Sequence, residues 1–82
     1  MSVRILFFSV LQDVVGCEEL EFEVPETVND VGGLLDVLYQ RWPSLQGWRQ
    51  KIRVAVDLDY VGLDHPLEEG QEIAVMPPVQ GG

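Results

Sequence analysis

One helical repeat lies between two groups of strand-like segments, and this order leaves few folds open to the chain. Apolar side chains recur at helical spacing from Val28 to Trp42, and Pro43 then ends the pattern. Thr27, with Asp30 three positions later, forms an approximate capping box, which predicts a helix N-cap at Thr27. The chain is therefore expected to contain one main helix.

Short apolar or alternating segments on both sides of this helix predict β-strands. Residues 18–24 alternate most plainly, with leucine, phenylalanine and valine on one face and glutamates on the other. Residues 3–8 are an apolar run broken only by an arginine, and residues 52–57 and 72–76 also alternate. Residues 60–61 are expected to form a short edge strand.

The resulting order is strand, strand, helix, strand, strand, in a chain of 82 residues that has room for one small core. One main helix packed on a mixed sheet of four to five strands is an α+β architecture, and this order fits the β-grasp fold. We expect the first two strands to pair antiparallel and the first and last strands to form a central parallel pair. Residues 1–76 are expected to form this domain, and residues 77–82 an extended C-terminal tail.

Glycines add local detail to this prediction. Residues 9–16 predict a helical turn that ends at Gly16, and residues 44–51 predict a loop with a short helical turn. Gly32 and Gly33 fall inside the main helical pattern, where each costs roughly 1 kcal/mol relative to alanine. They mark either a close packing contact or a weak point, and we favour packing.

The charge of the chain limits the class of partner. Five Lys and Arg residues oppose fourteen Asp and Glu residues, for a formal net charge of −9. Nucleic acids and anionic membranes require a basic surface, so neither is expected as a partner.

The sequence also bears on where the protein is located. The N-terminal apolar run is interrupted early, which argues against a signal peptide, and no stretch reaches the roughly 18 apolar residues of a membrane span. With one cysteine and hence no internal disulfide, we expect a cytoplasmic protein that meets a protein partner.

Few side chains are candidates for catalysis. One His and one Cys cannot build a zinc site, and no glycine-rich phosphate loop lies between a strand and a helix. His65 lies in an Asp-His-Pro turn, which favours a structural role. Cys17 is followed by two glutamates rather than by the cationic neighbours that activate a thiol. We expect this chain to bind no metal and no cofactor.

The C-terminal segment is the strongest functional signal. The last predicted strand runs directly into Pro77, Pro78 and Val79, and prolines leave the ladder and hold the backbone extended. Gly81 and Gly82 follow, and glycines can pass through a channel too narrow for any side chain. The six residues of this tail would reach about 20 Å from the domain. A frayed terminus is the plainer alternative, but the prolines and the position after the last strand favour a functional tail.

The chemistry available to such a tail is that of its terminal carboxyl group. This group is ionised at neutral pH and is a poor acyl electrophile until it is activated. A partner that holds ATP could convert it to an acyl adenylate, and a sulfur or nitrogen nucleophile could then take the acyl group.

An apolar patch is expected beside the root of the tail. Arg4 marks the outward face of the first strand, so alternation places Leu6 and Phe8 on that face as well. Exposed patches of this kind usually mark protein interfaces, whereas a one-residue error in strand phase would bury these side chains. The predicted patch comprises Leu6, Phe8, Ala55, Tyr60, Ala74 and Met76.

Three segments carry a resemblance to a known family: RILFFSVLQDVVG, PETVNDVGGLLDVLYQRWP and, above all, DHPLEEGQEIAVMPPVQGG. The chain resembles the small subunits of molybdopterin synthase. This resemblance implies a ubiquitin-like β-grasp sulfur carrier in molybdenum cofactor biosynthesis, without an active site of its own. It implies that an E1-like enzyme adenylates the terminal glycine with ATP, after which the terminus becomes a thiocarboxylate. It further implies that the tail enters a large catalytic subunit, in a heterotetramer, and donates sulfur to cyclic pyranopterin monophosphate (precursor Z).

The resemblance assigns roles to residues of this chain. Gly82 corresponds to the acyl carrier and Gly81 to its threading partner, while Phe8, Tyr60 and Met76 match interface positions. Two positions depart from the family pattern and bear on partner preference: Asp57 stands where the family often has Asn, and Gln12-Asp13 lie where an arginine is often found. The full set of residues expected to contact a partner is Leu6, Phe8, Tyr60, Met76, Pro77, Pro78 and Val79.

Three other functions stay open at this point: a sulfur carrier of another pathway, such as the thiamine type, a ubiquitin-like modifier of lysines, and an inert β-grasp binding module. The DHPL and PPVQGG segments favour the molybdopterin pathway.

The charged side chains lie in the body of the domain and not in its tail. Segments 1–30, 31–53 and 54–82 carry net charges of −6, +3 and −6, whereas residues 73–82 carry no charged side chain. The acidic body could therefore steer the domain towards a basic partner surface.

Overall fold

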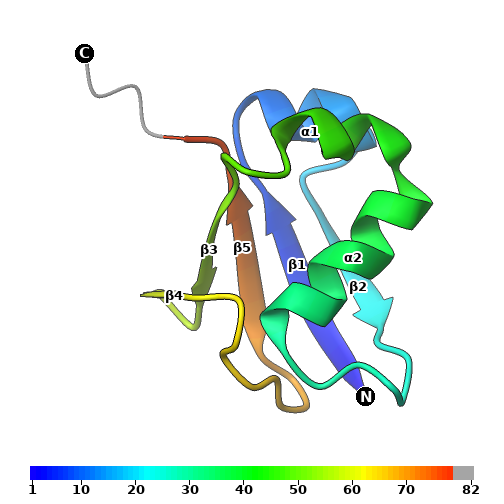
Figure 1. Ribbon diagram of the computed structural model, residues 1–82, viewed down its shortest axis with the longest axis vertical. Coiled ribbons are helices and arrows are strands. Elements are labelled where there is room, and N and C mark those ends of the chain that lie inside the picture. Colours follow the sequence, from blue (N-terminus) through cyan, green and yellow to red (C-terminus); the bar gives the residue numbers. More distant parts are fainter. Residues whose placement is uncertain (79–82) are drawn as a thin grey trace.

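Five strands form one mixed sheet in the computed structural model, which describes residues 1–78 (Figure 1). Their spatial order is β2-β1-β5-β3-β4, with β1 and β5 parallel at the centre and the other neighbours antiparallel. This arrangement confirms the predicted β-grasp fold and its central parallel pair. The strands are β1 (Ser2–Phe7), β2 (Glu19–Glu23), β3 (Arg53–Val56), β4 (Asp59–Val61) and β5 (Glu72–Met76).

The main helix α2 (Val31–Arg41) begins later than the sequence predicts. Its N-cap is Asp30, whose Oδ1 accepts a hydrogen bond from the Gly33 N–H at 2.8 Å. The predicted N-cap at Thr27 is therefore wrong. The reason is that a carboxylate at the N-cap satisfies the N–H group at the third helical position by itself, so no box extending back to Thr27 is needed. The helix ends at Arg41, before Pro43, as predicted.

The core lies between α2 and one face of the sheet. Ile5, Ile73 and Val75 point from the central strands to this face and are fully buried, as are Leu34 and Leu38 of the helix. The predicted inward phase of these strands is confirmed. Alternation therefore leaves the opposite face of the same strands outside the core.

Two short helices pack together and close one end of this core (Figure 1). Helix α1 (Val10–Val15) ends at Gly16, which takes the predicted left-handed conformation with φ 86°. The predicted turn after α2 is a 3₁₀ helix, η1 (Pro43–Trp48). Between them, the Trp42 ring packs edge-on against Phe7 with the ring centres 5.9 Å apart, which fixes the end of α2 to the sheet.

Gly32 and Gly33 lie in the first turn of α2 rather than in its middle. The Gly32 N–H donates a hydrogen bond to the Leu63 carbonyl at 2.8 Å, and a Cβ on Gly32 would lie 3.2 Å from that oxygen. A Cβ on Gly33 would lie 3.1 Å from Val28 Cγ1. Both glycines therefore mark close packing, as favoured from the sequence, here between the start of α2 and neighbouring loops.

Candidate functional site

The outward face of the sheet changes from charged to apolar along its strands. At one end Arg4 pairs in register with Glu21 and Glu72, and the Arg4 guanidinium lies 3.0 Å from the Glu72 carboxylate. One step towards the C-terminal end of β5, the next outward row is apolar across four strands. It consists of Leu6, Ala74, Ala55 and Tyr60, joined by the pairs Leu6–Ala74, Ala74–Ala55 and Ala55–Tyr60.

A second row lies next to the point where the chain leaves the sheet. Met76 ends β5 and pairs in register with Arg53, while the Phe8 N–H donates a hydrogen bond to the Val75 carbonyl at 3.2 Å. Phe8 therefore follows β1 at the same end of the sheet as Met76. Together the two rows form the patch predicted from the sequence, and we refer to its predicted residues as the apolar patch: Leu6, Phe8, Ala55, Tyr60, Ala74 and Met76.

The members of the apolar patch differ in exposure. Tyr60 is 65% exposed and Phe8 41%, and these two present the largest free apolar surfaces of the patch. Ala55 departs from the expectation because it is only 8% exposed. Its small side chain lies in register between Ala74 and the much larger Tyr60, so it forms a floor rather than a contact point.

Arg53 also belongs to this site, although the sequence analysis assigned it no role. Its guanidinium lies 5.8 Å from the centre of the Tyr60 ring, at cation–π distance. The signal was available, because Arg53 and Ala55 are two residues apart on one strand and hence share a face. What the sequence lacked was the register that places Arg53 opposite Met76.

The tail residues divide between described and undescribed positions. Pro77 and Pro78 follow β5 directly, lie in neither helix nor strand, and have partly buried side chains. Val79, Gly81 and Gly82 lie outside the described residues, so their expected roles stay predictions.

Comparison with known proteins decides the family. The family model described as "ThiS family" matches residues 5–82. The chain is 34% identical to the "Molybdopterin synthase sulfur carrier subunit" of Mycobacterium tuberculosis over 84 aligned positions, which cover all of this chain and 99% of the relative. The chain belongs to the ThiS family.

Solved structures similar to this ThiS-family chain include proteins with two different names. SAMP1 of Haloferax volcanii, the small archaeal modifier protein 1, has a TM-score of 0.82 and 27% identity, with full coverage of both chains. The complex of subunits 1 and 2 of the molybdopterin-converting factor of Helicobacter pylori contains a chain with a TM-score of 0.72 and 28% identity, again with full coverage of both.

The other two residues singled out in this ThiS-family member have structural surroundings, His65 through its backbone hydrogen bonds and Cys17 through partial burial. The His65 carbonyl accepts a hydrogen bond from the Val31 N–H, and its own N–H donates to the Gly62 carbonyl. Cys17 is partly buried against the core. Across residues 1–78, no three His, Cys, Asp or Glu side chains gather as a metal site would require. Within the same residues, no helix combines the length and apolar content needed to cross a bilayer.

Proposed function

We propose that this chain is the sulfur carrier subunit of molybdopterin synthase, with Gly82 as its acyl carrier. The observation that carries the proposal is the apolar patch at the end of β5, where the chain leaves the sheet towards Gly81 and Gly82. A domain that carries a reactive terminus must be held by its partner while the terminus reaches a remote site. An exposed apolar patch at the root of the tail supports that task.

The proposed chemistry takes place at the terminal carboxyl group. A carboxylate oxygen of Gly82 attacks the α-phosphate of ATP, and pyrophosphate leaves. A sulfide-level nucleophile then attacks the acyl carbon, the bond to AMP breaks, and a thiocarboxylate results. In the large subunit this sulfur passes to cyclic pyranopterin monophosphate, and water restores the carboxylate. This chain supplies the acyl group and the docking surface, whereas its partners supply the nucleotide and the acid–base groups.

The proposed partners are the large catalytic subunit of the synthase and an E1-like adenylating enzyme. The name of the Helicobacter pylori complex, in which a similar chain is joined to a second subunit, supports the first of these. The expected heterotetramer, the cytoplasmic location and the absence of a bound cofactor are part of the same proposal.

Mass spectrometry of the intact protein tests the proposal. Incubation with ATP, the cognate activating enzyme and a sulfur source should increase the mass by the difference between one sulfur and one oxygen atom. The loaded protein should then convert cyclic pyranopterin monophosphate in the presence of the large subunit. An unchanged mass with an activating enzyme proven on another carrier would refute the proposal.

A one-residue deletion provides the matched control. The variant that lacks Gly82 still ends in a glycine carboxylate, on Gly81, but one residue nearer to the domain. We expect it to lose sulfur transfer and to keep the thermal midpoint of the full chain, because terminal residues of this kind add little to folding. If the deletion unfolds the domain, the tail is structural and the proposed role is wrong.

A second candidate function is that of a protein modifier, and the likeness to small archaeal modifier protein 1 favours it. In that case the activated Gly82 would pass to lysine amines instead of to sulfur. Immunoblots of cells that express a tagged chain distinguish the two functions. Stable conjugates resistant to thiol reagents would support the modifier, whereas a free chain with a thiocarboxylate terminus supports the sulfur carrier.

A further inference from the structure

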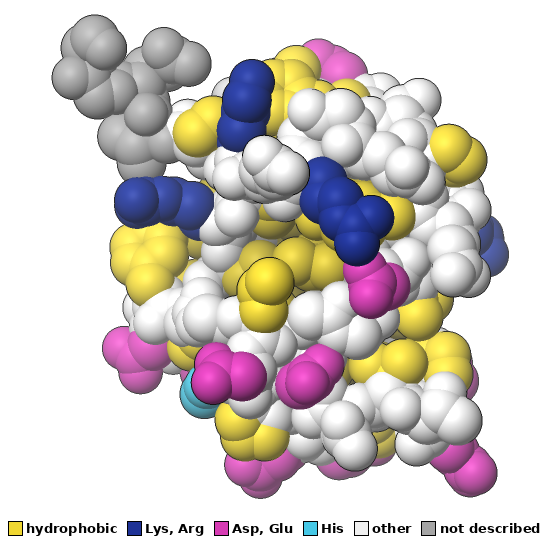
Figure 2. Space-filling view, in the orientation of Figure 1, with side chains coloured by type: hydrophobic (Ala, Val, Ile, Leu, Met, Phe, Trp, Pro, Cys, Tyr) yellow, Lys and Arg dark blue, Asp and Glu magenta, His cyan; other side chains and the backbone are white. Residues whose placement is uncertain are grey.

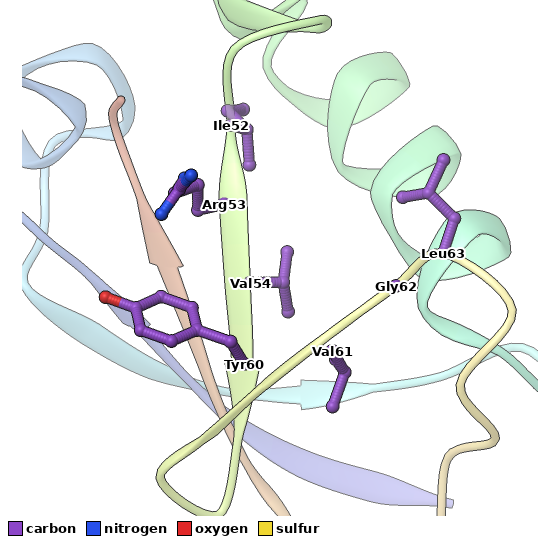
Figure 3. Close-up of a pocket in the computed structure, with 7 residues that line it drawn as sticks. All are labelled: Ile52, Arg53, Val54, Tyr60, Val61, Gly62 and Leu63. Atoms are coloured by element: carbon purple, nitrogen blue, oxygen red, sulfur yellow. The ribbon is translucent and has the colours of Figure 1, made fainter. Parts of the chain in front are cut away.

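A groove lies between α2 and the β3–β4 edge of the sheet, on the face opposite the apolar patch. In Figure 1, α2 crosses in front of β1 and β2 and leaves β3 and β4 to one side. Two adjoining hollows of about 400 Å³ and about 390 Å³ result, and Ile52 and Leu63 line both of them. Figure 3 shows the Ile52, Val54 and Leu63 side chains pointing towards the helix side of β3.

The exposed apolar side chain in this groove is held in place by its backbone. Leu63 is 62% exposed, yet its carbonyl accepts the hydrogen bond from Gly32 at the start of α2. The leucine is thus presented to solvent from a fixed position. An exposed apolar side chain on a fixed backbone suits an interface, because a partner that covers it has no backbone to order.

The rim of the groove carries the opposite charge from the rest of the molecule. Four of the five Lys and Arg residues of the chain lie at positions 41–53, although the net charge of the chain is −9. Arg49 lines one hollow and Arg53 the other, and Asp36, which bonds Arg49 at 3.2 Å, is the carboxylate in the lining. In Figure 2, Lys and Arg side chains lie above and beside an apolar hollow, and most of the visible Asp and Glu side chains lie below it.

The groove is continuous with the apolar patch around the edge of the sheet. Tyr60 belongs to the patch and also lines the first hollow, and Arg53 contacts Tyr60 while lining the same hollow. Only the short strand β4 separates the two surfaces. One partner can therefore cover both by wrapping around β4.

We propose that the groove receives an apolar segment flanked by acidic side chains from the same large subunit that covers the apolar patch. This inference rests on the proposed function for its partner. The apolar side chains of the segment would contact Ile52 and Leu63, and its carboxylates would pair with Arg49. Arg53, whose guanidinium lies against Tyr60 on the patch side, would meet the same partner where it wraps around β4. The rim thus selects an acidic segment although the body of the domain is itself acidic.

Methyl NMR of the full chain, titrated with the cognate large subunit, tests this directly. The methyl signals of Ile52, Val54 and Leu63 should shift or broaden on binding, together with that of Leu6 in the apolar patch. Leu58 is the internal reference, because it is 87% exposed at the β3–β4 turn and lines neither hollow. Its methyl signals should stay in place.

Paired variants provide the energetic test. Leu63→Ser should weaken the Kd for the large subunit roughly tenfold, whereas Leu58→Ser should leave it within about twofold. Arg49→Glu should weaken binding at least about tenfold, with the larger loss at low salt, while Arg41→Glu, which lies on neither lining, should have little effect. Unchanged thermal midpoints establish that the variants are folded.

The outcomes separate this inference from the proposed function. If Leu6 shifts and the groove methyls do not, or if Leu63→Ser and Leu58→Ser bind equally, the groove proposal is overturned and the sulfur carrier proposal stands. If no methyl responds to a large subunit that is active with another carrier, both proposals are overturned. If the groove methyls respond to the concentration of this chain alone, the groove contacts a second copy and the proposed occupant is wrong.

Discussion

Asp57 and Glu72 are joined by two hydrogen bonds that fasten the β3–β4 turn to the start of β5. The Asp57 side chain accepts a hydrogen bond from the Glu72 N–H at 3.0 Å, and the Asp57 N–H donates one to the Glu72 carbonyl at 2.9 Å. Asp57 has φ 48°, a left-handed conformation that Asp and Asn tolerate better than most residues. The aspartate thus combines turn geometry with a tie to the central strand pair.

Asp57→Ala should destabilise the domain by about 1–2 kcal/mol, because the Glu72 N–H loses its acceptor and alanine is strained at positive φ. Asp57→Asn should stay within about 0.5 kcal/mol of the wild type, since its side-chain oxygen can accept the same bond. Urea unfolding of both variants measures the difference. Equal losses for Asn and Ala would show that the carboxylate charge, rather than the hydrogen bond, is what matters.

Leu58 has a backbone conformation that leucine rarely adopts. It occupies the second position of a two-residue turn with φ 78°, where glycine is strongly preferred, and its side chain is 87% exposed. Leu58→Gly should therefore raise the free energy of unfolding by up to about 1 kcal/mol, since the relief of left-handed strain exceeds the entropy cost of glycine. Leu58→Ala is the control, because it keeps Cβ and hence the strain. If thermal melts show the two variants equally stable, the turn is not strained.

The periodic strands were predictable, whereas the contacts between them were not. Alternation along β2 places Leu20 and Phe22 against the core, and this pattern can be read from the sequence alone. The juxtaposition of Arg53 with Met76 and Tyr60 depends on the register of β3 with β4, across a two-residue turn, and with β5, which follows later in the sequence. Register is fixed by the packing of the whole sheet, so a single sequence revealed the face of each side chain and not its neighbour.

The start of α2 shows a second limit. Thr27 and Asp30 are both good N-cap residues, and local sequence does not rank them. The choice depends on a contact from a remote loop, because the Val31 N–H donates a hydrogen bond to the His65 carbonyl, and Asp30 forms a bridge with Pro66. These contacts hold the chain extended up to Asp30, so the helix starts after it.

Gly32→Ala should destabilise the domain by about 1 kcal/mol although alanine favours helices. The added Cβ would lie 3.2 Å from the Leu63 carbonyl oxygen, which the Gly32 N–H already holds at 2.8 Å, and overpacking of this kind outweighs the gain in helix propensity. Gly47→Ala is the control, because a Cβ at Gly47 meets nothing within 4 Å. It should be neutral or stabilise by a few tenths of a kcal/mol. Stabilisation by Gly32→Ala would mean that the loop at Leu63 yields readily, and would weaken the argument for a fixed leucine in the groove.

The ion pair between Glu23 and the amino group of Met1 should make stability depend on pH at both ends of the range. The two groups lie 3.0 Å apart. Their hydrogen bond lowers the pKa of Glu23 below its ordinary value of 4.5 and raises the pKa of the Met1 amino group above its ordinary value of 8.0. The stability that Glu23 contributes is therefore fully present above pH 4.5 and is lost as the pH falls through the lowered pKa of the folded state. The stability that the Met1 amino group contributes is fully present below pH 8.0 and is lost as the pH rises through the raised pKa of the folded state.

Glu23→Gln should be less stable than the wild type between these limits, and the difference should shrink on both sides when urea unfolding is followed across pH. Glu18→Gln, which removes an exposed carboxylate without an ion pair among the described residues, should leave the profile unchanged, and acetylation of Met1 should reproduce the effect of Glu23→Gln. A constant difference between wild type and Glu23→Gln from acid to alkaline pH would show that the pair does not contribute.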